Sequence, residues 1–151
     1  MGVARKRSTP LLQASSAASG ALQGFHVLVV DDHEDARELV ALVLEGAGAR
    51  VTQAESVRVA MSAIAGDDFS VLVSDIGMPM EDGYDLIRRL RVDADSHRRR
   101  PLPAVAVTAF TQPEDRKKAL AAGFQEHIAK PFDGPALVEV VARLAAASAE
   151  A

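Results

Sequence analysis

The sequence contains no cysteine and no tryptophan, and only 4% of its residues are aromatic. The absence of cysteine excludes a disulfide framework and any thiolate metal site. Long apolar runs are missing as well, since no stretch approaches the roughly 18 apolar residues of a membrane span. The basic N-terminus is not followed by the apolar segment of a signal peptide. We therefore expect a cytoplasmic protein with no membrane association.

The 151 residues carry a formal net charge of −4, which is unevenly distributed. Residues 1–24 hold three basic residues and no acidic one, so the remainder carries a formal −7. An acidic body disfavours binding to nucleic acid, which needs a basic face. Because residues 1–24 are rich in Ser, Ala, Gly and Gln, we expect a flexible tail there. One folded domain should then occupy residues 25–147, with a short C-terminal tail over 148–151.

From residue 25 onward, short apolar runs alternate with amphipathic helical patterns. The runs at 27–30, 71–73 and 105–107 are continuous, as in strands that are buried on both faces. Weaker strand candidates lie at 51–54 and 126–129, and a helical pattern follows each of the five. Five successive strand–helix units predict an α/β fold, in which helices cover both faces of an open, doubly wound parallel sheet.

Polar residues follow four of these five strands. Asp31 and Asp32 follow the first, Asp75 the third, Thr108 the fourth and Lys130 the fifth. The carboxyl ends of parallel strands meet at one edge, so we expect these side chains to lie together. Three crowded carboxylates repel one another unless a hard cation such as Mg²⁺ lies between them. A carboxylate beside Mg²⁺ can attack a phosphoryl group, while a hydroxyl and an ammonium bind its oxygens.

The chain resembles the receiver domains of response regulators over about residues 24–147. Four motifs carry the resemblance in the family's order: Asp31-Asp32, Asp75-Ile76-Gly77-Met78-Pro79 with Asp82-Gly83-Tyr84, Thr108-Ala109 and Lys130-Pro131-Phe132. The resemblance implies a flavodoxin-like (βα)5 fold with strand order 2-1-3-4-5. It also implies a protein that assists its own phosphorylation and dephosphorylation and is not a conventional enzyme.

The resemblance further assigns roles to individual residues. It makes Asp75 the phosphoacceptor for a histidine kinase or a histidine phosphotransfer protein. Thr108 and Lys130 would contact the phosphoryl oxygens, and the Lys130–Pro131 bond is expected to be cis. The implied ligands of Mg²⁺ are the side chains of Asp31, Asp32 and Asp75 and the backbone carbonyl of Gly77.

The sequence departs from the common receiver pattern at His127, where many members have Tyr or Phe. The receivers of hybrid sensor kinases, which this stretch resembles, often have His here, and the chain thus lacks the aromatic ring of the usual switch at this position. We expect His127 to act in output, towards an unknown downstream protein and without a DNA-binding output domain. His26, His33 and His97 have no partner at metal-ligand spacing, so we expect them to be solvated.

Three alternatives have to be weighed against a stand-alone receiver. A haloacid-dehalogenase-like phosphatase uses the same residue types, but its nucleophile follows the first strand and its acidic pair comes late. A flavodoxin-like FMN carrier needs a phosphate-binding loop after the first strand, where Asp31 and Asp32 would repel the phosphate. A receiver excised from a hybrid sensor histidine kinase remains open.

Overall fold

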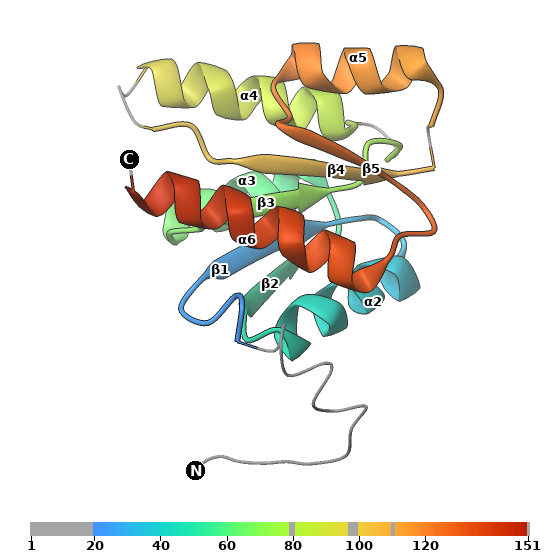
Figure 1. Cartoon of the computed structure of the whole chain (residues 1–151). Coiled ribbons are helices and arrows are strands. Elements are labelled where there is room, and N and C mark those ends of the chain that lie inside the picture. The colour runs from blue at the N-terminus through green and yellow to red at the C-terminus, as the bar shows by residue number, and fades with distance from the viewer. Residues whose placement is uncertain (1–19, 79–80, 97–99, 110, 151) are drawn as a thin grey trace.

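The fold is a five-stranded parallel sheet between two layers of helices (Figure 1). The computed structural model describes residues 20–78, 81–96, 100–109 and 111–150. Strands and helices alternate strictly along the chain: β1 (His26–Val30), α2 (Glu34–Gly46), β2 (Arg50–Ala54), α3 (Val57–Gly66), β3 (Val71–Ser74), α4 (Gly83–Ser96), β4 (Ala104–Thr108), α5 (Pro113–Ala122), β5 (Glu126–Ala129) and α6 (Gly134–Glu150).

The strand order is β2-β1-β3-β4-β5, and every neighbouring pair is parallel. The predicted doubly wound sheet with order 2-1-3-4-5 is therefore confirmed. The order reverses between β1 and β3, because the chain first builds outward to β2 and then returns to the other side of β1. In open sheets of this kind, ligands bind at the carboxyl ends of the strands beside that reversal.

Alternate side chains of the central strands enter two separate cores. Leu28 and Leu72 belong to the core beneath α3, α4 and α5, whereas Val27, Val29 and Val73 belong to the core beneath α2 and α6. All of these residues are at most 2% exposed. Strands that bury both faces consist of continuous apolar residues, which is the pattern seen in the sequence.

The expected domain limits need correction at both ends. Leu22, expected in the flexible tail, is fully buried in the α2–α6 core, and its backbone N–H donates to the Ala47 carbonyl over 2.9 Å. At the other end α6 runs on to Glu150 through the alanine-rich segment expected to be a tail. The carbonyl of Ser148 accepts a hydrogen bond from the Arg100 guanidinium, which ties this last turn to the fold.

The expectation that His26 is solvated is wrong. His26 begins β1 and is only 8% exposed. Its Nε2 lies 2.7 Å from the Thr52 hydroxyl, its Nδ1 lies 3.0 Å from the Asp68 carbonyl, and its ring packs on Phe69. These partners are 26 to 43 residues away along the chain, so no local pattern could have revealed them. His97 lies outside the described residues. None of the helices described is long and apolar enough to cross a membrane.

Candidate functional site

The sheet register brings the predicted site residues to one edge. Val30 is paired with Ser74, so the residues that follow them, Asp31 and Asp75, leave the sheet side by side. The ladder continues one step beyond the strands, because the Asp75 N–H donates to the Val30 carbonyl over 2.9 Å. Both carboxylates are buried, with Asp31 3% and Asp75 8% exposed.

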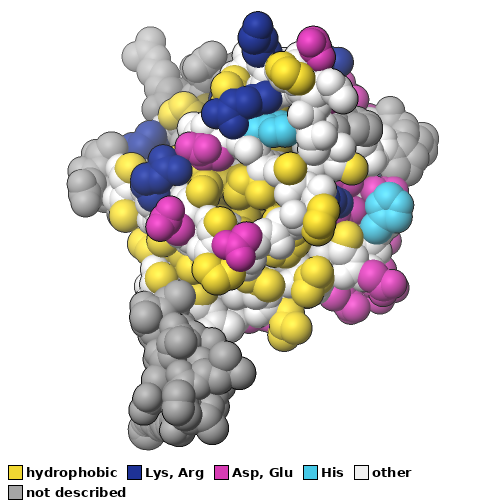
Figure 2. All heavy atoms as spheres, turned by 45° about the vertical axis from the view of Figure 1, so that its right-hand side comes forward, with side chains coloured by type: hydrophobic (Ala, Val, Ile, Leu, Met, Phe, Trp, Pro, Cys, Tyr) yellow, Lys and Arg dark blue, Asp and Glu magenta, His cyan; other side chains and the backbone are white. Residues whose placement is uncertain are grey.

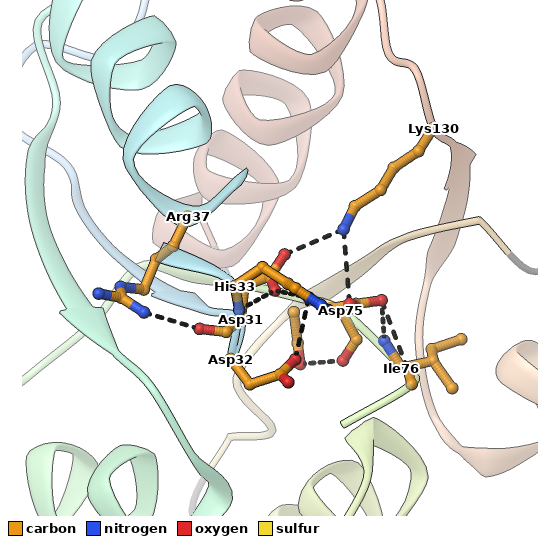
Figure 3. Close-up of polar contacts among 9 residues, drawn as sticks. Asp31, Asp32, His33, Arg37, Asp75, Ile76 and Lys130 are labelled. Carbon is orange, nitrogen blue, oxygen red and sulfur yellow. Dashed lines mark hydrogen bonds and ion pairs between the residues drawn. The ribbon is translucent and has the colours of Figure 1, made fainter. Parts of the chain in front are cut away.

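The carboxylate of Asp75 is held by the backbone that follows it. Its Oδ1 accepts a hydrogen bond from the Ile76 N–H over 2.7 Å and a longer one from the Gly77 N–H over 3.4 Å. These bonds fix the orientation of the carboxylate, and Oδ2 then faces Lys130 (Figure 3). Oδ1 of Asp75 is thus anchored by backbone N–H groups, and Oδ2 is directed towards Lys130. This is a suitable arrangement for a carboxylate nucleophile.

Lys130 is the cation of the site. Its Nζ donates to Asp31 Oδ2 over 3.0 Å and to Asp75 Oδ2 over 3.4 Å (Figure 3). Burial of the ammonium lowers the pKa of Lys130, but the hydrogen bond to Asp31 and the charges of Asp75 and Asp31 outweigh it and raise the pKa above 10.5. Lys130 therefore stays charged at neutral pH, ready to bind an anion.

The last two strands place Lys130 beside Thr108. Thr108 ends β4, is 1% exposed and is paired with Ala129 of β5. One step further, the Lys130 N–H donates to the Thr108 carbonyl over 2.9 Å. The Lys130–Pro131 bond is cis, as the family resemblance implied.

Asp31, Asp32, His33 and Asp75 form a cluster that can hold a cation. One ligand atom from each of the four lies within 4.8 Å of the others. The Oδ1 atom of Asp32 is buried and has no hydrogen-bond partner in the described part of the chain. A buried carboxylate oxygen without a donor is costly, and an oxygen-lined cluster of this kind suits a hard divalent ion. The residues therefore fit a metal site.

His33 was missed by the sequence analysis, which set it aside as solvated. Its side chain is 70% exposed, but its Nδ1 lies 3.3 Å from Asp32 Oδ1 and 3.5 Å from Asp31 Oδ1. The available signal was its position directly after the acidic pair. The role of the Gly77 carbonyl in binding Mg²⁺ stays a prediction.

The loop after β3 packs closely on the start of α4. The Gly83 N–H donates to the Ile76 carbonyl over 2.8 Å. A β-carbon at Gly83 would lie 2.5 Å from the Asp75 carbonyl oxygen, so only glycine fits. Met78 of this loop is buried, whereas Pro79 lies outside the described residues.

His127 lies outside the acidic cluster, on the edge strand β5. It is half-buried and paired with Ala106 of β4. Its neighbour Ile128 packs into the core beneath α2 and α6, so the alternation of side chains along a strand directs His127 to the opposite face, on which α5 lies. Its predicted role in output stays a prediction.

Comparison with known proteins decides the family. Residues 27–142 match the model of the response regulator receiver domain. This chain belongs to that family. The receiver is 41% identical over 115 residues to an uncharacterized 14.6 kDa protein of Leptolyngbya boryana, covering 76% of this chain and 86% of that one. It is 32% identical over 113 residues to the response regulator SaeR of Staphylococcus aureus, and there it spans 75% of this chain but 47% of SaeR.

Solved structures agree with this membership of a two-component signalling family. A response regulator from Chloroflexus aurantiacus, described as putative, superposes with a TM-score of 0.74 at 32% identity, over 81% of this chain and 98% of that one. The receiver domain of Saccharomyces cerevisiae Ssk1, solved with the histidine phosphotransfer protein Ypd1, gives a TM-score of 0.77 at 19% identity over 83% and 91% of the two chains. The latter likeness concerns the fold alone.

Proposed function

We propose that this receiver accepts a phosphoryl group on Asp75 from a phosphohistidine of a histidine kinase or a histidine phosphotransfer protein. A carboxylate oxygen of Asp75 attacks phosphorus, an O–P bond forms, and the N–P bond to the donor imidazole breaks. The electron pair of that bond stays on the imidazole nitrogen, which then takes up a proton. The product is an aspartyl phosphate, an acyl phosphate formed by covalent catalysis.

The observation that carries the proposal is the position of Lys130 between two buried carboxylates, 3.0 Å from Asp31 and 3.4 Å from Asp75. Packing does not require three acids and a lysine at one sheet edge, since buried charges are costly to desolvate. An incoming phosphoryl group would give the ammonium a third anion to bind. Thr108, at the end of the adjacent strand, would donate its hydroxyl to another phosphoryl oxygen.

In this proposal the side chains of Asp31, Asp32 and Asp75 hold Mg²⁺ together with the carbonyl of Gly77. Mg²⁺ supplies positive charge that neutralises the carboxylates and the phosphoryl oxygens. The carboxylates contribute hard oxygen donors, and the Oδ1 of Asp32, which lacks a hydrogen bond from the described residues, is the one most in need of a cation. Lys130 binds the anion, and the Ile76 N–H keeps the Asp75 carboxylate oriented.

The signal would leave through contacts with another protein. Figure 2 shows a face on which apolar side chains gather at the centre, with acidic and basic side chains around them. Such a mixture of apolar core and charged rim is typical of protein interfaces. A receiver fold contacts a histidine phosphotransfer protein in the Ssk1–Ypd1 complex, which supports a partner of that kind, in the cytoplasm.

Phosphorylation with a small donor tests the proposal. With Mg²⁺ and acetyl phosphate, the protein should gain one phosphoryl group, stable in acid and labile in base, detected by intact mass. Asp75→Asn should gain none, because an amide lacks the nucleophilic oxygen anion. Asp67→Asn, at the opposite end of the sheet beside Arg50, is the matched control and should react normally. Equal labelling of wild type and Asp75→Asn would refute Asp75 as the acceptor.

A further inference from the structure

His33 lies at the exposed side of the acidic cluster, and its imidazole does not cap the helix that it precedes. It is the N-cap residue of α2, with φ −91° and ψ 114°, yet its side chain makes no capping hydrogen bond. The backbone of His33 is held instead by the residue two positions earlier, because the His33 N–H donates to Asp31 Oδ1 over 2.9 Å. That bond holds the residue against the carboxylates, which its side chain then faces (Figure 3).

The distances allow the imidazole and the carboxylates to share one ion. Nδ1 of His33 lies 3.3 Å from Asp32 Oδ1 and 3.5 Å from Asp31 Oδ1. First-row divalent metals bind imidazole nitrogen and carboxylate oxygen at about 2.0–2.2 Å, so donors on the same ion are separated by roughly 3–4 Å. The four donors of the cluster lie within 4.8 Å, and small side-chain rotations would bring them onto one ion.

We propose that His33 is a nitrogen ligand of this cluster, and that the site therefore binds a transition-metal dication such as Zn²⁺ more tightly than it binds Mg²⁺. The inference rests on the proposed function, because the carboxylates are those that would hold Mg²⁺. It adds a fourth side chain, of a different donor class. Oxygen-only sites suit Mg²⁺, whereas imidazole suits Zn²⁺, Cu²⁺ and Ni²⁺.

The consequence is a pocket whose occupant depends on which metal is available. Divalent first-row metals bind mixed nitrogen and oxygen sites with affinities that rise towards Cu²⁺ and remain high for Zn²⁺. Zn²⁺ would then displace Mg²⁺ from the carboxylates beside Asp75. The alternative is that His33 only forms an ion pair with Asp31 and Asp32, which would leave the oxygen donors to select the metal.

The test is calorimetric titration of Zn²⁺ and of Mg²⁺ into wild type and His33→Asn. Asparagine favours the N-cap position and retains an oxygen donor, so the variant removes the imidazole while α2 still starts in place. We expect the Zn²⁺ affinity of His33→Asn to fall at least about tenfold and its Mg²⁺ affinity to change little. His127→Asn, outside the cluster, should match wild type for both ions. Excess Mg²⁺ should compete with Zn²⁺, and Cu²⁺-loaded wild type should show nitrogen hyperfine coupling that His33→Asn loses.

Several results would overturn the inference while leaving the phosphoacceptor proposal intact. These are equal Zn²⁺ affinity of wild type and His33→Asn, Zn²⁺ binding that Mg²⁺ does not compete with, or tighter binding of Mg²⁺ than of Zn²⁺ by wild type. Absence of binding for both ions would refute the metal site altogether, and with it both proposals for this cluster.

Discussion

The backbone of Gly83 passes so close to Asp75 that a β-carbon on it would lie 2.5 Å from the Asp75 carbonyl oxygen and 2.9 Å from the Ile76 α-carbon. Both are backbone atoms and cannot rotate away. Gly83→Ala should therefore push α4 from the acceptor loop and lower the free energy of unfolding by about 1–3 kcal/mol. Phosphorylation by acetyl phosphate should slow, because the displaced loop positions the acceptor. Chemical denaturation and labelling rates measure the two effects.

Gly66→Ala is the matched control for this substitution. Gly66 ends α3, and a β-carbon there meets nothing within 4 Å. Alanine at a compatible helical position leaves stability unchanged or raises it by about 0.4–1 kcal/mol. Equal behaviour of the two variants would mean that the close approach at Gly83 is not present in solution.

The sequence was sufficient to predict the sheet and the side chains that meet at its edge, because both depend on local patterns. Three strands contain short continuous apolar runs and the other two fit the strand–helix alternation, while Asp31, Asp75, Thr108 and Lys130 lie at the carboxyl ends of four of the five. Once the strands are parallel, their carboxyl ends must meet. The Lys130–Asp75 contact joins residues 55 apart, yet topology alone predicts it.

Other features could not be predicted, because they depend on tertiary contacts that leave no periodic signal. Leu22 is buried through a backbone bond to Ala47, in a segment whose composition indicated a tail. His26 is buried by partners on β2 and on the loop before β3. His33 joins the acidic cluster through the backbone geometry at the start of α2, for which its position directly after Asp32 was the one sequence signal.

Asp32→Asn should stabilise the metal-free protein. The Asp32 Oδ1 atom is buried without a hydrogen bond from the described chain, and its charge adds to the repulsion from Asp31 and Asp75. We expect the free energy of unfolding in EDTA to rise by about 1 kcal/mol. Asp75→Asn should raise the free energy of unfolding less, since it also weakens the ion pair with Lys130.

Thermal melts with EDTA and with Mg²⁺ check this prediction. Mg²⁺ should raise the Tm of wild type by binding only the folded state, and should raise that of Asp32→Asn less. Asp68→Asn, exposed at the far end of the sheet, should behave as wild type. A lower Tm of Asp32→Asn than of wild type in EDTA would show that the carboxylates are not crowded.

The Lys130 ion pairs should make stability depend on pH in the alkaline range. Folding raises the pKa of Lys130 above 10.5 through Asp31 and Asp75, despite the opposing effect of burial. The stabilisation that these ion pairs give the folded state is therefore fully present below pH 10.5 and is lost as the pH rises through the pKa of Lys130 in the folded protein. Denaturant unfolding of wild type and Lys130→Met over that pH range measures this contribution. The difference between their free energies of unfolding should shrink as the pH rises. A difference that grows with pH would contradict the assigned contacts.

Tyr84 offers a direct optical test, because it is the only tyrosine and the sequence has no tryptophan. It is 5% exposed, and the Lys118 ammonium lies 4.4 Å from its ring centroid. Burial, followed by the charges of Asp115 and Asp82, raises its pKa above 10.0, although Arg88 opposes this. Tyrosinate absorbance should therefore appear at higher pH in the folded protein than in denaturant. Identical midpoints in both conditions would place Tyr84 in solvent.

His127→Ala should separate output from phosphorylation. His127 lies on the edge strand, on the face where α5 packs and outside the acidic cluster. Lys130, three residues later, is held by Thr108, Asp31 and Asp75, so truncation at 127 should leave the acceptor chemistry close to wild type. Removing an imidazole that contacts the partner should weaken binding of the phosphorylated form roughly fivefold, or about 1 kcal/mol.

The measurement is a binding titration of the cognate partner with the phosphorylated or beryllofluoride-bound proteins, alongside labelling rates with acetyl phosphate. Arg58→Ala, on the exposed side of α3, serves as the control, because α3 covers the sheet at its opposite edge, beside β2 and β1. It should leave both measurements unchanged. Slower labelling of His127→Ala with unchanged partner affinity would instead place His127 in the phosphorylation step. A phosphoryl group acts on a partner only through a surface that differs between the two states, so loss of binding without loss of labelling would assign His127 to that surface.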